Sequence, residues 1–206
     1  MYKNLYDNHE FINYIGNKKN IGFGAGHNKI VNLISNTSEL HLILNPDVFF
    51  DKNTINSLAE KLLSEKSLAM IAPRVKFPNG NEQYTVRKYP SFLDLFLRKI
   101  GIGTQRIYAQ EYRDLDLSEP FYPEAIHGCF MLFKTEDFIA LDGFDERYFL
   151  YMEDIDICKK IDALGKKKLY YPEVEITHVL KKGSSKNIIL FYHHLSSAIR
   201  YFLKWK

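Results

Sequence analysis

Short apolar runs that end in turn residues alternate with amphipathic segments in the first part of this chain. The run Leu40–Leu44 stops at Asn45-Pro46, a pair that does not continue a regular element. A helix capped by Asp51 or Asn53 is expected next, because the following apolar residues recur at helical spacing: Ile55, Leu58, Leu62 and Leu63. A second apolar run, Leu68–Pro73, completes the order strand, helix, strand. This order predicts an α/β protein built on a layered sheet.

Segments of the same kinds return later, after residues 76–124 interrupt the rhythm. In that interruption we expect a helix at Phe92–Ile100, ended by glycines, and a long loop at Tyr108–Pro123 of the kind that binds ligands. The other predictions are a weak strand at 11–15, a helix at 29–34, a buried strand at 129–133, helices at 136–141 and 153–164, an extended segment at 169–179, and an amphipathic helix from Asn187 onward.

Composition limits the class of protein. Hydrophobic residues make up 46% and charged residues 26% of the 206 residues, which excludes a disordered or collagen-like chain. The net charge of +3 is too small to indicate nucleic-acid binding. No apolar run is long enough to cross a bilayer, and the first ten residues lack the apolar core of a signal peptide. Cys129 and Cys158 are expected to be buried free thiols in a reducing compartment.

Asp47 is the first candidate site residue, because it follows the predicted strand Leu40–Leu44 at its carboxyl end. Ligands of open α/β sheets bind outside the carboxyl ends of strands. A carboxylate there suits a divalent cation that shares its oxygen ligands with substrate phosphates, and Asn45 would add a neutral contact. The alternative is that Asn45-Pro46-Asp47 is a simple turn in which Asp47 caps the next helix.

Three carboxylates crowd the start of the helix predicted at 153–164. A carboxylate near apolar walls has a raised pKa and can act as a general base, and aromatic residues flank this group. The alternative is that the carboxylates only stabilise the helix dipole. On a helix Glu153 and Asp156 share a face while Asp154 points elsewhere, so the three need not do one job.

The glycine-rich stretch Gly22–Gly26 does not have the GxGxxG spacing of a dinucleotide site, and the glycines are better explained by a tight turn into a helix. Asn28 at that helix either binds a ligand or caps. His178 follows an extended apolar segment and is either structural or a metal ligand. No Cys-His or Ser-His-Asp constellation follows from the spacing alone.

Four stretches of the chain carry a family resemblance: Asn20–Asn28, Leu42–Val48, Gly128–Ile161 and Tyr171–His178. The third is the most specific, because it joins the turn Gly143-Phe144-Asp145-Glu146 to an aromatic-rich helix start with Glu-Asp-Ile-Asp. In these stretches the chain resembles the family 2 glycosyltransferases of GT-A fold, and most closely their bacterial rhamnosyltransferase-like members. The resemblance covers residues 11–206 and implies a GT-A-like, Rossmann-like mixed sheet flanked by helices, with a C-terminal amphipathic helix.

The resemblance also implies a role for each candidate residue. Asp47 matches the position that holds the divalent metal, Mg²⁺ or Mn²⁺, on the donor diphosphate, and His178 matches one that completes this site in some members. Asp154 matches the general base, and Glu153 would position the acceptor or the base. The resemblance also implies that the donor is bound by four further residues: Asn28, Asn45, Gly128 and Cys129. The implied reaction is inverting transfer of a sugar from a nucleotide-diphosphate donor.

One departure from the family matters. Its members normally begin with a strand, a helix and a second strand ending in Asp-Asn-x-Ser, and these elements hold much of the nucleotide. We expect the present chain to be N-terminally truncated relative to that layout. The alternative to an enzyme is therefore a non-catalytic remnant, or half of a split enzyme, that acts as an interaction module. A third and weaker interpretation is a metal-dependent hydrolase of phosphorylated sugars that uses Asp47 and Asp154.

The leading interpretation is an enzyme, a transferase of rhamnose or another deoxyhexose from a dTDP- or UDP-sugar to a glycan or lipid-linked acceptor in polysaccharide synthesis. Arg74, Arg87, Lys88 and Arg98 would engage the acceptor, unless they form only a solvated face. The transferase domain is expected at 1–180 and the C-terminal helix at 181–206. That helix, with basic Arg200, Lys204 and Lys206 and with Trp205, lies on an anionic membrane surface or packs back on the domain. We expect a cytoplasmic protein, peripheral at the inner face of the membrane.

Overall fold

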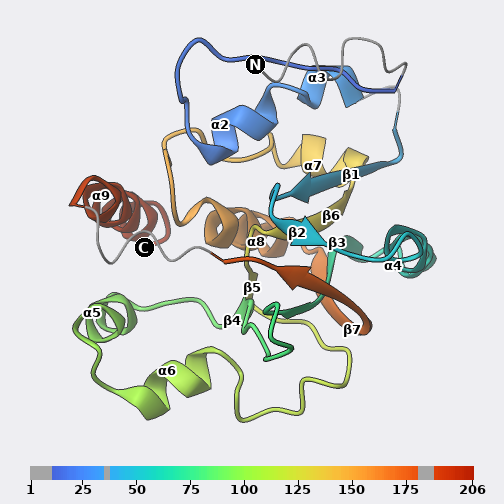
Figure 1. Ribbon diagram of the computed structural model, residues 1–206. Helices are drawn as coiled ribbons and strands as arrows, with labels where there is room; N and C mark the ends of the chain where they lie inside the picture. The colour runs from blue at the N-terminus through green and yellow to red at the C-terminus, as the bar shows by residue number, and fades with distance from the viewer. Residues whose placement is uncertain (1–10, 35–37, 181–187) are drawn as a thin grey trace.

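The computed structural model describes residues 11–34, 38–180 and 188–206 (Figure 1). Its strands are β1 (Leu40–Leu44), β2 (Val48–Phe49), β3 (Leu68–Lys76), β4 (Val86–Arg87), β5 (Ala125–Ile126), β6 (Phe130–Lys134) and β7 (Lys167–His178). Its helices are α2 (Phe23–Asn28), α3 (Val31–Ile34), α4 (Thr54–Ser64), α5 (Phe92–Ile100), α6 (Thr104–Gln110), α7 (Thr135–Ala140), α8 (Glu153–Ala163) and α9 (Ile188–Lys204).

A five-stranded mixed sheet forms the centre of the molecule, in the order β1-β6-β3-β7-β2. β3 and β7 run parallel, while β6 is antiparallel to both of its neighbours and β2 is antiparallel to β7. β4 and β5 make a separate two-stranded ladder. The α/β class and the mixed sheet flanked by helices are therefore confirmed.

Helices cover both faces of the sheet, and the side chains of β6 show how. Phe130 and Leu132 point to the face that α4 covers, where they pack in one apolar cluster with Leu58 and Leu62. Met131 and Phe133 point to the opposite face, in a cluster that includes residues of α7 and α8. Each such side chain stabilises the fold by roughly 1.5–3 kcal/mol when fully buried. This two-sided burial explains why the run is apolar at every position.

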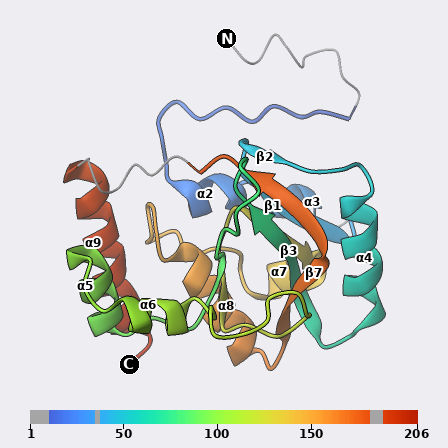
Figure 2. The ribbon, with the colours of Figure 1, turned by 60° about the horizontal axis from the view of Figure 1, so that its bottom comes forward.

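The C-terminal helix α9 packs back onto the domain, beside α8 (Figure 2). Tyr201 is buried with Tyr148 and Met152, and the Ser197 hydroxyl donates to the carbonyl of Leu150 at 2.9 Å. Of the two expectations for this helix, packing on the domain is the one that the structure has. The predicted start at Asn187 and the predicted domain boundary at 180/181 fall at residues 181–187, outside the described part of the chain.

Several expected elements differ at their ends, and one is absent. Residues 11–15 form no strand, because they run along the surface without a partner strand. The helix expected at 29–34 is shorter, because α3 begins only at Val31, and a separate helix, α2, precedes it directly after Gly22. The first part of the loop expected at Tyr108–Pro123 completes helix α6. The helix expected at 136–141 begins one residue earlier, at Thr135, and ends at Ala140.

Candidate active site

Strand pairing brings two distant parts of the sequence together at one end of the sheet. The backbone N–H of Asn45 donates to the carbonyl of Cys129 at 3.0 Å, which continues the β1–β6 ladder and sets Asn45 close to Gly128. Next to it, β2 pairs with the end of β7 so that Val48 lies opposite His178. Asp47, which precedes β2, is thereby placed against the end of β7.

Asp47 and His178 face each other across this pairing. Asp47 Oδ1 lies 3.3 Å from His178 Nε2, and the Asp47 carbonyl accepts from the N–H of Val179 at 3.0 Å. On the other side of the ring, His178 Nδ1 lies 2.6 Å from Gln83 Oε1, and Gln83 Nε2 donates to the His178 carbonyl at 3.3 Å. The amide oxygen of Gln83 faces Nδ1 of His178, so Nδ1 carries the ring proton. Nε2 is then unprotonated, and its lone pair points at the Asp47 carboxylate.

Burial lowers the pKa of His178, and the nearby Asp47 carboxylate only partly offsets this effect. The imidazole is therefore neutral at pH 7, and two acceptor atoms face one another. A divalent cation suits such a pair of one carboxylate oxygen and one imidazole nitrogen. Within residues 11–34, 38–180 and 188–206 no group of three or more His, Cys, Asp or Glu side chains could hold a metal ion. Asp47 and His178 therefore fit a cation that takes its other ligands from substrate oxygens and water.

Asp154 lies in the first turn of α8 and is held by the turn that precedes β6. Its Oδ2 accepts from the backbone N–H of Gly128 at 3.2 Å, and its Oδ1 accepts from the N–H of Ile155 at 2.9 Å. A β-carbon on Gly128 would lie 3.4 Å from the β-carbon of Asp154, so the glycine permits this close approach. The carboxylate is half-buried and fixed in orientation, as a general base must be.

Glu153 is buried next to Asp154 and behaves differently. Burial raises the pKa of Glu153 to about 8, and the charge of Asp154 adds to the rise. Glu153 therefore carries its proton at neutral pH. Its Oε2 has no hydrogen-bond partner among the described residues. A protonated, buried carboxyl with one free oxygen, beside a carboxylate base, is able to donate a hydrogen bond to a ligand.

A cavity of about 440 Å³ opens beside these two carboxyl groups. Its lining includes Glu153, Asp154, Asn45 and Gly128, the guanidinium groups of Arg87 and Arg98, and the rings of His127 and His194. Four of the eight residues predicted as site residues thus share one cavity, and Asp47 and His178 lie next to it. The ring of His178 lies 6.4 Å from that of the lining residue His127, centroid to centroid.

Three arginine side chains near this cavity surround the single buried carboxylate of Glu111, so their positive charge exceeds its negative charge. Glu111 is buried and binds Arg98 at 2.6 Å and Arg113 at 2.6 Å, while Arg87 lies 4.0 Å from the same carboxylate. Burial and the neighbouring Arg98 lower the pKa of Arg87, and its Nε has no hydrogen-bond partner among the described residues. Because Glu111 shares its one charge among three guanidinium groups, Arg87 and Arg98 on the cavity wall are only partly neutralised by it and suit an anionic ligand.

The turn that leads into α8 is strained. Tyr151 and Met152 have φ angles of 68° and 72°, in the left-handed region that residues other than glycine rarely adopt. Each such residue costs of order 1–3 kcal/mol, and such residues cluster at functional sites. Met152 is buried against Tyr201, which holds the turn in this conformation. The turn thereby places Glu153 and Asp154 at the cavity.

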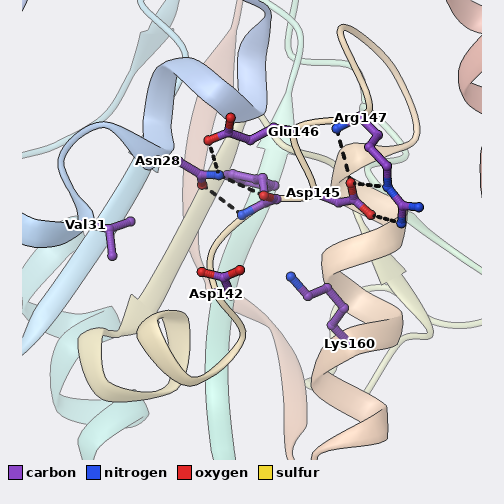
Figure 3. A pocket seen from close by; sticks show the side chains of 8 residues that line it. Asn28, Val31, Asp142, Asp145, Glu146, Arg147 and Lys160 are labelled. Atoms are coloured by element: carbon purple, nitrogen blue, oxygen red, sulfur yellow. Dashed lines mark hydrogen bonds and ion pairs between the residues drawn. The ribbon is translucent and has the colours of Figure 1, made fainter.

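Two predicted donor-binding residues lie elsewhere. Asn28 lines a second cavity, of about 490 Å³, drawn in Figure 3. Its amide accepts from the N–H of Phe144 at 2.9 Å and donates to the carbonyl of Phe144 at 2.8 Å, so both ends of the amide hold the Gly-Phe-Asp-Glu turn. The Cys129 side chain is buried in the α4-side cluster, which leaves only its backbone at the site. These contacts favour a structural role for Asn28 over ligand binding.

The carboxylates of the Glu-Asp-Ile-Asp segment do separate jobs. Asp156 is fully buried and accepts from Lys204 Nζ at 2.8 Å and from Trp205 Nε1 at 2.7 Å. It therefore anchors α9 and takes no part in the cavity. His127, Gln83 and the strained turn are site features that sequence reasoning missed. None carries a local signal, because each acts through contacts between elements far apart in the chain.

Several known proteins are similar to this chain in sequence. The chain is 26% identical over 195 residues to the rhamnosyltransferase WbbL of Escherichia coli K12, covering 87% of this chain and 69% of that protein. It is 23% identical over 194 residues to the N-acetylglucosaminyl-diphospho-decaprenol L-rhamnosyltransferase of Mycobacterium tuberculosis H37Rv, covering 87% and 63%. It is also 26% identical over 152 residues to the hexosyltransferase Agl10 of Haloferax volcanii, covering 73% and 46%. No family model matches the chain.

The fold agrees with these relatives. The structure matches the crystal structure of GalNAc-T7 with UDP, GalNAc and Mn²⁺ at a TM-score of 0.61 and 16% identity, over 87% of this chain and 34% of the other. The chain is a homologue of the bacterial rhamnosyltransferases and has the GT-A glycosyltransferase fold. This glycosyltransferase homologue spans about two thirds of the length of the two rhamnosyltransferases.

Proposed function

We propose that this glycosyltransferase homologue transfers rhamnose or another deoxyhexose, with inversion, from a dTDP- or UDP-sugar to a lipid-linked glycan. The observation that carries the proposal is the fixed Asp154 carboxylate at a cavity that also holds Arg87 and Arg98 and adjoins the Asp47–His178 pair. The names of the relatives give the sugar and the acceptor class.

Asp154 is the proposed general base. Its carboxylate takes the proton of the acceptor hydroxyl as that oxygen forms a bond to the anomeric carbon of the donor sugar. The bond from the anomeric carbon to the donor diphosphate breaks on the opposite face, and the diphosphate leaves with the bonding electrons, which inverts the configuration. The N–H of Gly128 keeps the carboxylate oriented throughout. Protonated Glu153 donates a hydrogen bond to the acceptor.

Asp47 and His178 are the proposed binding point for the donor diphosphate. When bound there, Mg²⁺ or Mn²⁺ neutralises charge on the leaving diphosphate. Gln83 keeps the imidazole in the tautomer whose Nε2 lone pair faces outward, as it does for metal-bound histidines in general. Asn45 and Gly128 line the cavity on the donor side.

The arginine cluster is the proposed acceptor subsite. A lipid-linked glycan whose first sugar is attached through a diphosphate carries negative charge next to the reacting sugar. Arg87 and Arg98 meet that charge at the cavity wall, and Glu111 fixes the guanidinium of Arg98. In the part of the chain that the structure describes, no helix is long and apolar enough to span a bilayer. We propose that the protein acts in the cytoplasm, at the inner face of the membrane.

Calorimetric titration with dTDP and UDP, each with and without Mn²⁺ or Mg²⁺, tests the donor site. Incubation with dTDP-rhamnose and a diphosphate-linked N-acetylglucosamine lipid then tests transfer. Metal-dependent nucleotide binding together with transfer supports the proposal. A folded chain that binds neither nucleotide with either metal contradicts it and favours the non-catalytic interpretation.

A further inference from the structure

The side of helix α9 that meets the domain carries buried Ala198 and Tyr201 together with polar residues. Lys204 binds Asp145 and Asp156, and the guanidinium of Arg200 donates to the carbonyl of Arg147. The apolar stripe of the helix points the other way and is exposed, with exposed fractions from 45% to 78%: Ile188, Ile189, Tyr192, Leu195, Ile199 and Leu203. An amphipathic helix normally buries its apolar stripe against its own domain, so this arrangement is the reverse of the usual one.

Helix α5 adds to the same exposed surface. Its apolar residues Phe92, Leu93, Phe96 and Ile100 have exposed fractions from 47% to 64%. The two helices lie side by side in both views (Figures 1 and 2), with the ring of Phe92 5.9 Å from that of Phe202 and Lys99 Nζ 4.3 Å from the centroid of Phe191. We call the ten exposed residues of these two stripes the α5–α9 face. Continuous apolar surface of this kind marks an interaction site.

The charges around the α5–α9 face favour one partner. Within the described residues 188–206 there is no Asp or Glu, and Arg200 and Lys206 are exposed there, whereas Lys204 is turned inward. Asp94 is the one acidic residue of α5, and Arg106 and Ser91 bind its carboxylate. Lys99 is exposed beside the apolar residues. Apolar and aromatic residues with only basic charges at their border are the composition of helices that lie in the surface of an anionic bilayer.

We propose that the α5–α9 face docks on a lipid bilayer that contains anionic phospholipid, with both helices parallel to the membrane plane. The inner sides of the same helices reach the active-site cavity, through Leu95 and Arg98 of α5 and His194 of α9. Docking therefore sets the acceptor side of the cavity at the membrane surface. This purpose rests on the proposed function, because a lipid-linked acceptor is embedded in the bilayer, but the docking itself does not require sugar transfer.

Vesicle flotation tests the docking. The full chain is mixed with vesicles of phosphatidylethanolamine containing about a quarter phosphatidylglycerol, and with vesicles of phosphatidylcholine alone. We expect the chain to float with the anionic vesicles, and to float less as salt is raised. The variant Phe96→Gln/Ile199→Gln is expected to bind at least tenfold more weakly. Leu63→Gln, which alters an exposed leucine of α4 on the opposite side of the molecule, is the matched control and is expected to bind as the unchanged chain does.

Two results overturn the proposal. One is a folded chain that floats with neither kind of vesicle, or a double variant that floats as well as the control. The other is sedimentation showing a stable dimer that the double variant dissociates, with no vesicle binding, because a second copy would then occupy the face. If vesicle binding is found but nucleotide binding and transfer are not, the docking stands and the proposed function fails.

Discussion

His178 Nε2 and Asp47 Oδ1 lie 3.3 Å apart, and Gln83 holds the proton of the ring on the far nitrogen. The two atoms that face each other are thus both acceptors, each able to bind a cation. The pair exists only because β2 and β7 align Val48 with His178. Its position at the edge of the cavity makes it the proposed binding point for the donor diphosphate.

Asp47→Asn is expected to weaken metal-dependent binding of dTDP at least tenfold, because the substitution removes the one anionic ligand while keeping the size of the side chain. Calorimetric titration with and without Mn²⁺ measures this. Asp51→Asn is the matched control, since it removes the same charge from an exposed site four residues away, where the carboxylate only accepts from the N–H of Asn53. Equal losses in both variants would show a general charge effect instead of a metal ligand.

Asp154→Asn is expected to lower kcat by about 10²–10⁴, because the amide cannot accept the acceptor proton. The amide oxygen still accepts from the N–H of Gly128, while the amide nitrogen faces the N–H of Ile155, so the thermal midpoint is expected to fall only slightly and the affinity for dTDP to stay unchanged. Sugar-transfer kinetics and calorimetry measure the three quantities. Transfer at a near-normal rate would rule out Asp154 as the base.

Glu153 makes the stability of the fold depend on pH. Its folded pKa of about 8 is above the ordinary value of 4.5, so between these values the folded state binds more protons than the unfolded state. The free energy of unfolding therefore falls as pH rises from about 4.5 to 8, by up to about 1.4 kcal/mol per pH unit. Glu153→Gln is expected to remove this fall and to be the more stable protein at pH 8.

Urea unfolding of the two proteins between pH 5 and 8 measures the difference. His41, whose pKa burial lowers to about 4, has the opposite effect and makes stability rise with pH up to about 6.5. That effect is the same in both proteins and cancels in their difference. Parallel curves for the variant and the unchanged chain would mean that Glu153 is ionised in the folded state.

Local patterns allow some elements to be predicted, and the reasons are visible in the structure. The helix at Phe92–Ile100 has the predicted bounds, because a Ser91–Asp94 capping box begins it and Gly101 in the left-handed conformation ends it. The strand at Leu40–Leu44 also has its predicted bounds. Both depend on residues adjacent in the chain. The start of α2 does not, since Gly22 is required there by the carbonyl of Phe149.

The site was predictable to a smaller extent. Helical spacing separates Asp154 from Asp156, and the structure has them apart. The same spacing puts Glu153 on a face with Asp156, whereas Glu153 lines the cavity with Asp154. Helical spacing also identifies the apolar stripe of α9, but it does not say which side of the helix meets the domain. That choice depends on the buried Asp156, whose charge draws Lys204 inward.

The glycines of α2 differ in what their neighbours allow. A β-carbon on Gly24 would lie 2.8 Å from the β-carbon of Phe144, whereas one on Gly26 would meet nothing within 4 Å. Gly24→Ala is therefore expected to destabilise the fold by about 1–3 kcal/mol through overpacking. Gly26→Ala is expected to stabilise it by up to about 1 kcal/mol, because alanine is the better helix former. Urea unfolding measures both, and equal effects would contradict the close packing of α2 on Phe144.

Lys204 neutralises the only fully buried carboxylate of α8. Asp156 keeps hydrogen bonds from Trp205 and Tyr148 when the ammonium group is removed, but it loses its counter-charge. Lys204→Met is therefore expected to destabilise the protein by about 3 kcal/mol, as breaking a buried ion pair does. The control is Lys206→Met, two residues further on at an exposed position, for which a change within about 0.5 kcal/mol is expected. Urea unfolding measures both values. A small effect for Lys204→Met would mean that α9 is held by apolar contacts such as Tyr201, and that its polar side is not what turns the apolar stripe outward.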